Sequence, residues 1–240
     1  MNANRLKLLM MGLMILDHIS YFVPLEWVLI FHVITRCVGV FFGYMAVEGF
    51  KYTRNVYRYN GRLYIWAGIM FIGNTLLNQL VNNPDVAVHN NIFLTLALGV
   101  SLLIVTKAMI EMSKISLKII LLVGMLIILG TGVVFAEGGT VMLPFMLITY
   151  LARKNLVLRN SLYGALAFFF LSISFQWLGD WQTTAEMLAY NSDFMFITVI
   201  PFLFLYNGER GSKAPFFKYL FYGFYPLHLW MIALIANYVQ

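Results

Sequence analysis

Four ionisable side chains lie within apolar stretches of the chain, and they are the first candidates for chemistry. Asp17 and His18 are adjacent within residues 8–23, Arg36 lies in the next apolar stretch, and His228 lies in the last one. A charged group in hydrocarbon costs roughly 2.5–3.5 kcal/mol on insertion scales, so such residues mark functional sites. Histidine titrates nearest to physiological pH and can act as a general base or carry protons. The four side chains therefore predict a reaction centre or an ion path.

The two adjacent residues of the first stretch are expected to have separate partners. Neighbouring side chains on a helix point about 100° apart, so Asp17 and His18 cannot easily bond each other. We expect Asp17 to pair with Arg36 or to orient His228 from across the bundle. His18 then faces a different neighbour. The pair of Asp17 with Arg36 taken alone is equally compatible with a structural role, in which the two buried charges only neutralise each other.

The composition places these residues in an integral membrane protein. Hydrophobic residues make up 61% of the 240 positions, charged residues make up 11%, and the mean hydropathy is +0.81. Soluble domains are about 45–50% apolar and about 25% charged. We predict a single polytopic membrane domain over residues 1–240, because no linker or low-complexity segment divides the chain. The net charge of +6 fits cytoplasmic loops, so we expect the lipid bilayer as a partner and no nucleic acid.

The basic residues set the predicted topology. A membrane-spanning helix needs roughly 20 apolar residues. We predict an all-α bundle of about nine transmembrane helices, over residues 7–24, 27–50, 63–82, 91–110, 119–136, 140–152, 160–178, 194–206 and 219–239. With a cytoplasmic N-terminus, fifteen of the 16 lysines and arginines fall in inner segments, and the remaining one is Arg36. Basic residues collect on the cytoplasmic side, which predicts a cytoplasmic N-terminus and a C-terminus outside.

Other polar residues of the predicted helices are candidates for lining a cavity. Asn74 and Asn78 share one helix face, and their simpler role is hydrogen bonding between helices. Asn91 begins the fourth helix, which it is also placed to cap. The candidate cavity residues are Asn74, Asn78, Asn91, Tyr225 and Glu48.

The predicted cytoplasmic loop between the second and third helices is dense in cations and aromatic rings. Contact with lipid headgroups is the simpler explanation. The sharper alternative is a site for a phosphate-bearing cosubstrate, in which the cations bind phosphates and a tyrosine stacks on a base. The residues of this candidate site are Lys51, Tyr52, Arg54, Arg58 and Arg62. The sequence has no Gly-rich phosphate loop, Cys/His metal spacing or Ser nucleophile elbow, so we expect His- and Asp-based chemistry without a metal.

Several short segments, ordered along nearly the whole chain, resemble those of one family of membrane proteins. They are Leu-Met-Ile-Leu-Asp-His-Ile at 13–19, Arg36 with 38–44, Asn-Ile-Phe at 91–93, Tyr150 with Arg153, and Phe-Tyr-Pro-Leu-His-Leu at 224–229. The set resembles the TraX family, whose best-known member N-acetylates conjugative pilin. The resemblance implies an acyltransferase of the bacterial inner membrane that uses acetyl-CoA. It also suggests an analogy with transmembrane acyltransferases, in which an intramembrane histidine serves acyl transfer.

The leading hypothesis is an N- or O-acetyltransferase. Acetyl-CoA would approach from the basic inner face, and a peptide or glycan acceptor would enter from the outer side. His18 or His228 would deprotonate the acceptor, and Asp17 would orient one of them. Arg36 would hold Asp17 or the acyl carbonyl. The alternatives are a small proton-coupled transporter, in which the same residues form a relay, and a non-enzymatic assembly factor for a membrane peptide.

Overall fold

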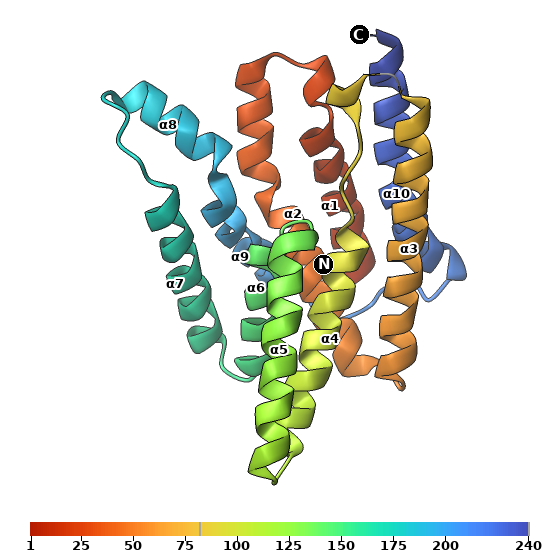
Figure 1. Cartoon of the computed structure of the whole chain (residues 1–240), viewed down its shortest axis with the longest axis vertical. Coiled ribbons are helices and arrows are strands. Elements are labelled where there is room, and N and C mark those ends of the chain that lie inside the picture. The colour runs from red at the N-terminus through yellow and green to blue at the C-terminus, as the bar shows by residue number, and fades with distance from the viewer. Residues whose placement is uncertain (82, 240) are drawn as a thin grey trace. The chain divides into compact units, whose positions relative to one another are not determined.

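The computed structural model describes residues 1–81 and 83–239, and within them it contains helices and loops but no strand (Figure 1). The last residue of the predicted third span, Asn82, lies outside the described residues, as do Gln240 and the side chain of Lys218. The α-helices are α1 (Ala3–His18), α2 (Leu25–Tyr52), α3 (Val56–Leu80), α4 (Ile92–Glu111), α5 (Ile115–Phe135), α6 (Gly139–Leu151), α7 (Leu156–Ser174), α8 (Trp181–Tyr190), α9 (Ile200–Leu205) and α10 (Pro215–Val239). The 3-10 helices are η1 (Ser20–Phe22), η2 (Pro84–Val86) and η3 (Ser192–Val199).

The helices confirm the all-α membrane-protein class. Within the described residues, α2, α4, α5, α7 and α10 are long and apolar enough to cross a bilayer. The segment 181–205 adds a sixth span if α8 and the following η3–α9 segment, bent by 61° from each other, cross together. α1 and α6 are short, at 16 and 13 residues. The count of nine spans and the orientation of the termini stay predictions.

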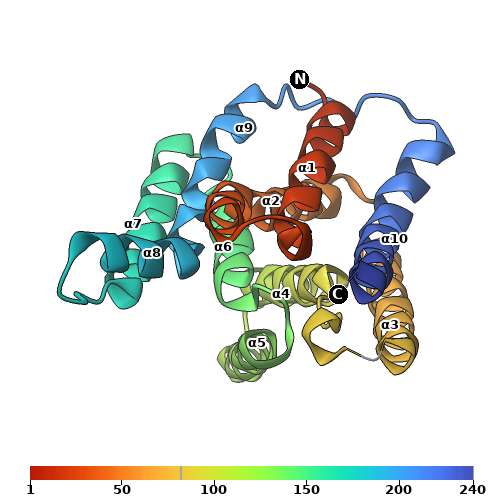
Figure 2. The same cartoon turned by 90° about the horizontal axis from the view of Figure 1, so that it is seen from above.

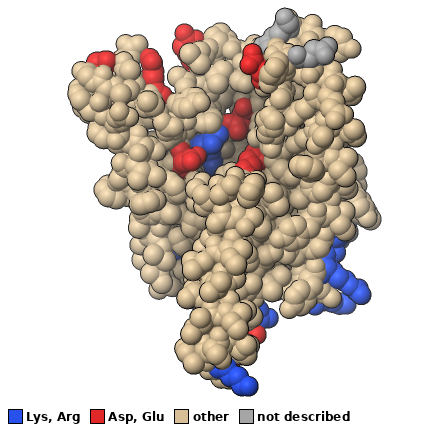
Figure 3. All heavy atoms as spheres, in the orientation of Figure 1, with Lys and Arg blue, Asp and Glu red and all other residues tan. Residues whose placement is uncertain are grey.

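Much of the apolar surface of these helices faces outward, as a lipid solvent requires. The exposed side chains of α5 include Ile120, Leu126 and Ile127. The face of the molecule in Figure 3 is formed mainly by uncharged residues, with charged atoms in a few places. Such a surface is stable against lipid tails and unfavourable in water.

The described chain divides into two compact units, and each is described by itself. Unit 1 contains Met1–Phe41, Gly73–His89 and Asn160–Gln240, and unit 2 contains Phe42–Ile72 and Asn90–Arg159. The helices α2, α3 and α7 contribute residues to both units. The organisation of residues 1–240 as a single domain stays a prediction.

Unit 2 has its core where α4, α5 and α6 pack together. The buried cluster contains Leu98, Leu102, Met125 and Leu143. Glycine lets these helices approach closely, because a Cβ on Gly132 would lie 2.1 Å from the Cδ1 atom of Leu143. Small residues are typical of helix contacts inside membranes.

Unit 1 contains the contact between α1 and α10, which lie beside each other (Figure 2). α10 also packs on the last turns of α3, where a Cβ on Gly73 would lie 2.1 Å from Cζ2 of Trp230. The indole Nε1 of Trp230 donates to Oδ1 of Asn74 at 2.9 Å. This bond confirms the expected interhelical role of Asn74. α10 is thereby fixed to two neighbours, and it carries His228.

The first helix ends earlier than the sequence analysis predicted. We expected it to continue to residue 24, whereas α1 ends at His18 and is followed by η1. Pro24 keeps the helix from resuming after η1, because proline disfavours helical backbone in the residue before it. Val23 accordingly has the extended angles φ −132° and ψ 152°. The Asp17–His18 pair therefore lies at the end of a helix and not within one.

The segment 179–193, expected to be an outer loop, contains the helix α8. Asp180 caps this helix, because its Oδ1 accepts a hydrogen bond from the backbone N–H of Thr183 at 2.8 Å. Trp181 and Tyr190, at the two ends of α8, are 71% and 70% exposed. The predicted seventh span, residues 160–178, is shifted toward the N-terminus, because α7 begins at Leu156 and ends at Ser174.

Candidate functional site

The end of α1 directs Asp17 and His18 toward different neighbours. Asp17 contacts α2, where its Oδ1 accepts a hydrogen bond from the hydroxyl of Thr35 at 2.6 Å. His18 faces α10, with its ring centroid 5.3 Å from that of His228. The expectation that the two adjacent residues have separate partners is confirmed.

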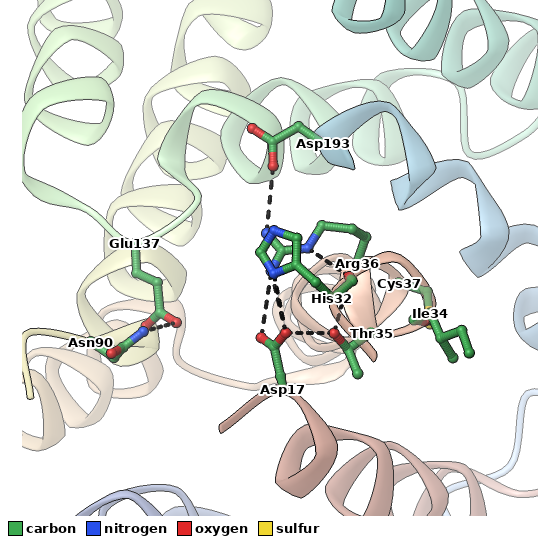
Figure 4. Close-up of polar contacts among 9 residues, drawn as sticks. All are labelled: Asp17, His32, Ile34, Thr35, Arg36, Cys37, Asn90, Glu137 and Asp193. Carbon is green, nitrogen blue, oxygen red and sulfur yellow. Dashed lines mark hydrogen bonds and ion pairs between the residues drawn. The ribbon is translucent and has the colours of Figure 1, made fainter. Parts of the chain in front are cut away.

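Arg36 joins two carboxylates that are far apart in the sequence (Figure 4). Its Nη2 lies 3.4 Å from Oδ1 of Asp17, which confirms the expected pair, and its Nη1 lies 3.5 Å from Oδ1 of Asp193. Its Nε also donates to the backbone carbonyl of His32 at 3.2 Å. Two carboxylates around one guanidinium leave a net negative charge at this cluster.

His32 completes the polar cluster. Its Nδ1 lies 2.9 Å from Nη2 of Arg36. Because a guanidinium can only donate, Nδ1 accepts this bond and the ring proton is on Nε2. Asp17 lies 3.6 Å from the same Nδ1, which is beyond a hydrogen bond. The other flank of the His32 ring stacks on Tyr190, with centroids 6.4 Å apart and planes 23° from parallel.

His228 is the most completely enclosed of the four ionisable candidates Asp17, His18, Arg36 and His228, with 7% of its surface exposed. Its Nδ1 lies 2.8 Å from the carbonyl oxygen of Phe224, one turn earlier in α10. Because a carbonyl oxygen only accepts, Nδ1 carries the proton and Nε2 carries a lone pair. Nε2 is buried and has no hydrogen-bond partner among the described residues. The ring is held between Phe224, stacked at 4.7 Å, and Tyr225, edge-on at 5.7 Å.

One of the expected pairings is not formed. We considered that Asp17 orients His228, but the imidazole of His228 is oriented by the carbonyl of Phe224. A ring nitrogen that does lie near Asp17 is Nδ1 of His32, 3.6 Å from its Oδ1. A helical histidine can bond the carbonyl four residues back, so no carboxylate is required to select its tautomer.

Four contributors to this cluster were absent from the predicted site. They are His32, Thr35, Tyr190 and Asp193. The first two follow from helical spacing, because positions 32, 35 and 36 share one face of α2. Tyr190 is the last residue of α8 and Asp193 lies in η3, and no local pattern links either residue to α2.

The remaining candidates of unit 1 have structural contacts. Asn74 accepts from Trp230, as described above. Asn78 bonds both backbone groups of Val88, through Nδ2 at 3.0 Å and Oδ1 at 2.9 Å. Asn78 therefore fixes the loop that follows its own helix, and the expectation that it bonds another helix is wrong.

The other predicted residues belong to unit 2 and are described apart from the histidines. Asn91 caps α4 by accepting from the backbone N–H of Leu94, and its Nδ2 donates to the carbonyl of Ala67. Lys51 lies 3.9 Å from Glu48 and 4.7 Å from the ring of Tyr52. The candidate phosphate-binding side chains are exposed, namely Lys51, Tyr52, Arg54, Arg58 and Arg62. A second polar contact of this unit joins Asn90 to Glu137 at 2.9 Å (Figure 4).

The arrangement in unit 1 is suited to proton transfer. It supplies a buried imidazole with a free lone pair, a second imidazole next to it, and an anionic cluster one residue away along α1. No group of three or more His, Cys, Asp or Glu able to hold a metal ion occurs in the described part of the chain.

Comparison with known proteins assigns the family. Neither a curated protein nor a solved structure matches the chain. The model of one family, described as TraX protein, matches residues 2–236. The match covers the Asp17–Arg36 cluster and both histidines of the α1–α10 contact. The chain therefore belongs to the TraX protein family.

Proposed function

We propose that the chain is a membrane-embedded acetyltransferase, which moves an acetyl group from cytosolic acetyl-CoA to an acceptor amine or hydroxyl at the outer side of the membrane. The observation that carries the proposal is the buried Nε2 of His228, which has a lone pair and no partner among the described residues. Such a nitrogen is ready to accept a proton from an acceptor. Burial also keeps water from competing as a nucleophile.

In the proposed reaction, Nε2 of His228 takes the proton of the acceptor N–H or O–H as that atom attacks the thioester carbonyl carbon. A tetrahedral intermediate forms and collapses, which breaks the bond between carbon and sulfur. The proton passes from His228 to the departing sulfur, so the products are the acetylated acceptor and CoA with a free thiol. His18, 5.3 Å from His228 between ring centroids, is the second acid–base group.

The polar cluster has a different role in this proposal. The donors of Arg36 are directed at Asp17, Asp193 and the carbonyl of His32, so Arg36 holds the carboxylates in place. The net negative charge of the cluster favours an acceptor that carries a positive charge, such as the amino terminus of a pilin-like peptide. A cell-surface glycan is the alternative acceptor and would not need this charge.

The proposed topology has nine spans, a cytoplasmic N-terminus and an outside C-terminus in the inner membrane of a bacterium. Contacts within unit 1 support it. The backbone N–H groups of Ala3 and Asn4 donate to the carbonyls of Glu209 and Arg210, so two segments assigned to the inner side meet. The hydroxyl of Tyr21 donates to the carbonyl of Asp85, so two segments assigned to the outer side also meet.

The exposed cations of residues 51–62 have a supporting role in the proposal. At the cytoplasmic surface they attract the phosphates of acetyl-CoA, because clustered positive charge raises the local concentration of a polyanion. The same charges attract anionic lipid headgroups.

The test uses purified protein in nanodiscs with radiolabelled acetyl-CoA and a peptide amine. Wild type, His18→Ala and His228→Ala are compared for CoA binding and for acetyl transfer. We expect binding in all three forms and loss of transfer in the His228 variant. His89→Gln is the matched control, because His89 is exposed and outside the site. Failure of the wild type to bind acetyl-CoA would contradict the proposal.

A further inference from the structure

Besides the cations of residues 51–62, two cations, Lys7 and Arg210, lie near the end of the α1–α10 contact that is opposite the histidines. The Nζ of Lys7 is 4.9 Å from the centroid of the Phe221 ring on α10. The backbone carbonyl of Arg210 accepts from the backbone N–H of Asn4, one turn before Lys7. This backbone bond brings the segment that carries Arg210 to the first turn of α1, one turn from Lys7.

In the part of the chain that the structure describes, no carboxylate neutralises these two cations. Neither Lys7 nor Arg210 forms an ion pair with a carboxylate within the described residues. Arg36, at the other end of unit 1, faces two carboxylates. Like charges held together without a counter-ion are unfavourable, and a bound anion would remove this cost.

The backbone that carries Arg210 is fixed against the N-terminus. Nδ2 of the buried Asn4 donates to the carbonyl of Ser212 at 2.9 Å. Gly211 has φ +82°, and a Cβ at this position would lie 2.8 Å from the side chain of Asn2. The glycine therefore permits both the left-handed backbone and the close approach. Because the backbone on both sides is held in place, an anion that binds here has only the two side chains to order.

A ligand that contacts both the cations and the histidines must span the distance between them along α1 and α10. Lys7 and His18 are eleven residues apart on α1, which is about 16 Å along the helix axis at 1.5 Å per residue. Phe221 and His228 are seven residues apart on α10, or about 10 Å. The pantetheine arm of CoA has roughly thirteen bonds between phosphorus and sulfur, and it extends about 15 Å at about 3.5 Å for every three bonds.

We propose that Lys7 and Arg210 bind phosphate groups of acyl-CoA, which places the thioester at His18 and His228. The inference rests on the proposed acetyltransferase function and assigns the phosphate-binding residues within the unit that carries the histidines. The cations of residues 51–62 differ, because two of them already have partners in the protein: Lys51 contacts Glu48 and the ring of Tyr52, and Arg62 contacts the ring of Tyr59. Arg210 is exposed as they are, but it lies in the unit that carries the histidines. Lys7 is half-buried against Phe221 and is suited to hold a ligand in one position.

The experiment measures binding of CoA to the full chain in nanodiscs of neutral phosphatidylcholine. Lys7→Gln and Arg210→Gln are each expected to weaken binding about tenfold, the effect of losing one charge-assisted contact. Lys7→Arg keeps the charge and is expected to retain binding, which controls for misfolding. Binding of S-acetylpantetheine, which lacks the phosphates, should be the same in all forms. Lys114→Gln, an exposed cation between α4 and α5, is the matched control.

The outcomes separate this inference from the proposed function. If wild type does not bind CoA at all, the proposed function fails, and this inference fails with it. If wild type binds CoA and both glutamine variants bind it equally well, the assignment of Lys7 and Arg210 is wrong while the function stands. The cations could instead bind the phosphate of a lipid headgroup, and lipid binding measured as phosphatidylglycerol is added to the nanodiscs tests this alternative. Loss of lipid binding with unchanged CoA binding in the variants would also overturn the assignment.

Discussion

The Nδ1 of His228 donates a hydrogen bond to the carbonyl oxygen of Phe224 at 2.8 Å, one turn earlier in the same helix. This contact selects one tautomer of the ring and leaves the lone pair on Nε2. Helix α10 therefore prepares its own histidine as a base. The Asp17–Arg36 cluster is therefore not needed to orient His228, and its net negative charge can serve another purpose.

Removal of the Thr35 hydroxyl tests how firmly Asp17 is held. Thr35→Val should lower the free energy of unfolding by about 1.5–3 kcal/mol, the usual value of a hydrogen bond to a charged group. Titration with SDS in mixed micelles measures this quantity. Thr35→Ser keeps the hydroxyl and should retain most of the stability. Equal losses in the two variants would show that the 2.6 Å bond to Asp17 is not the cause.

The Asp17–Arg36 pair should show energetic coupling in a double-mutant cycle. Asp17→Asn and Arg36→Gln each leave the other partner without its neighbour, whereas the double variant removes both charges. Because both side chains are about three-quarters buried, we expect a coupling of about 1 kcal/mol in the free energy of unfolding. Strictly additive losses would contradict the pairing. A second double-mutant cycle, with Asp193→Asn and Arg36→Gln, measures the coupling between Arg36 and Asp193.

Much of this cluster follows from the sequence, and part of it does not. The cost of charge in hydrocarbon identified Asp17 and Arg36, and the 100° step between helix neighbours predicted that His18 faces elsewhere. Asp193 and Tyr190 could not be predicted, because their approach to α2 depends on how α8 and η3 are placed in the tertiary structure. That Lys7 has no ion-pair partner among the described residues could not be predicted either, because it depends on which side chains surround Lys7.

The helices, too, could be predicted from the sequence only in part. Apolar length predicted the long helices, but it also extended the first helix to residue 24, although Pro24 disfavours helical backbone at Val23. Asp180 followed by Thr183 is the pattern of a helix cap, and it could have revealed α8. The bend between α8 and the segment 192–205 has no local cause in the sequence, since it depends on packing.

The contact between α3 and α10 should not tolerate a methyl group. Gly73→Ala places a Cβ 2.1 Å from the ring of Trp230, so we expect a loss of about 1–3 kcal/mol in the free energy of unfolding. Gly124→Ala is the matched control, because no atom lies within 4 Å of that Cβ, and it should leave stability unchanged or raised. SDS titration compares the two variants. A loss of the same size in both would mean that helix propensity and not the clash decides the effect.

The α8 cap should depend on pH. Hydrogen bonds from the backbone N–H and the hydroxyl of Thr183 hold the pKa of Asp180 below its usual range. A carboxylate with a lowered folded pKa stabilises the fold above its unfolded pKa, near 4, and this contribution is lost as the pH falls through the folded value. A spin label at Ala185→Cys should therefore become more mobile in acid. Asp180→Asn should remove the pH dependence, and an unchanged profile in this variant would rule out Asp180 as its source.

The central claim is that Nε2 of His228 is the base, and single-turnover transfer of the acetyl group in nanodiscs tests it most directly. His228→Gln should slow transfer at least about 100-fold, the usual contribution of a general base, while CoA affinity stays within about twofold. His89→Gln should match wild type in both measurements. Transfer by His228→Gln at the wild-type rate, with normal CoA binding, would contradict the account.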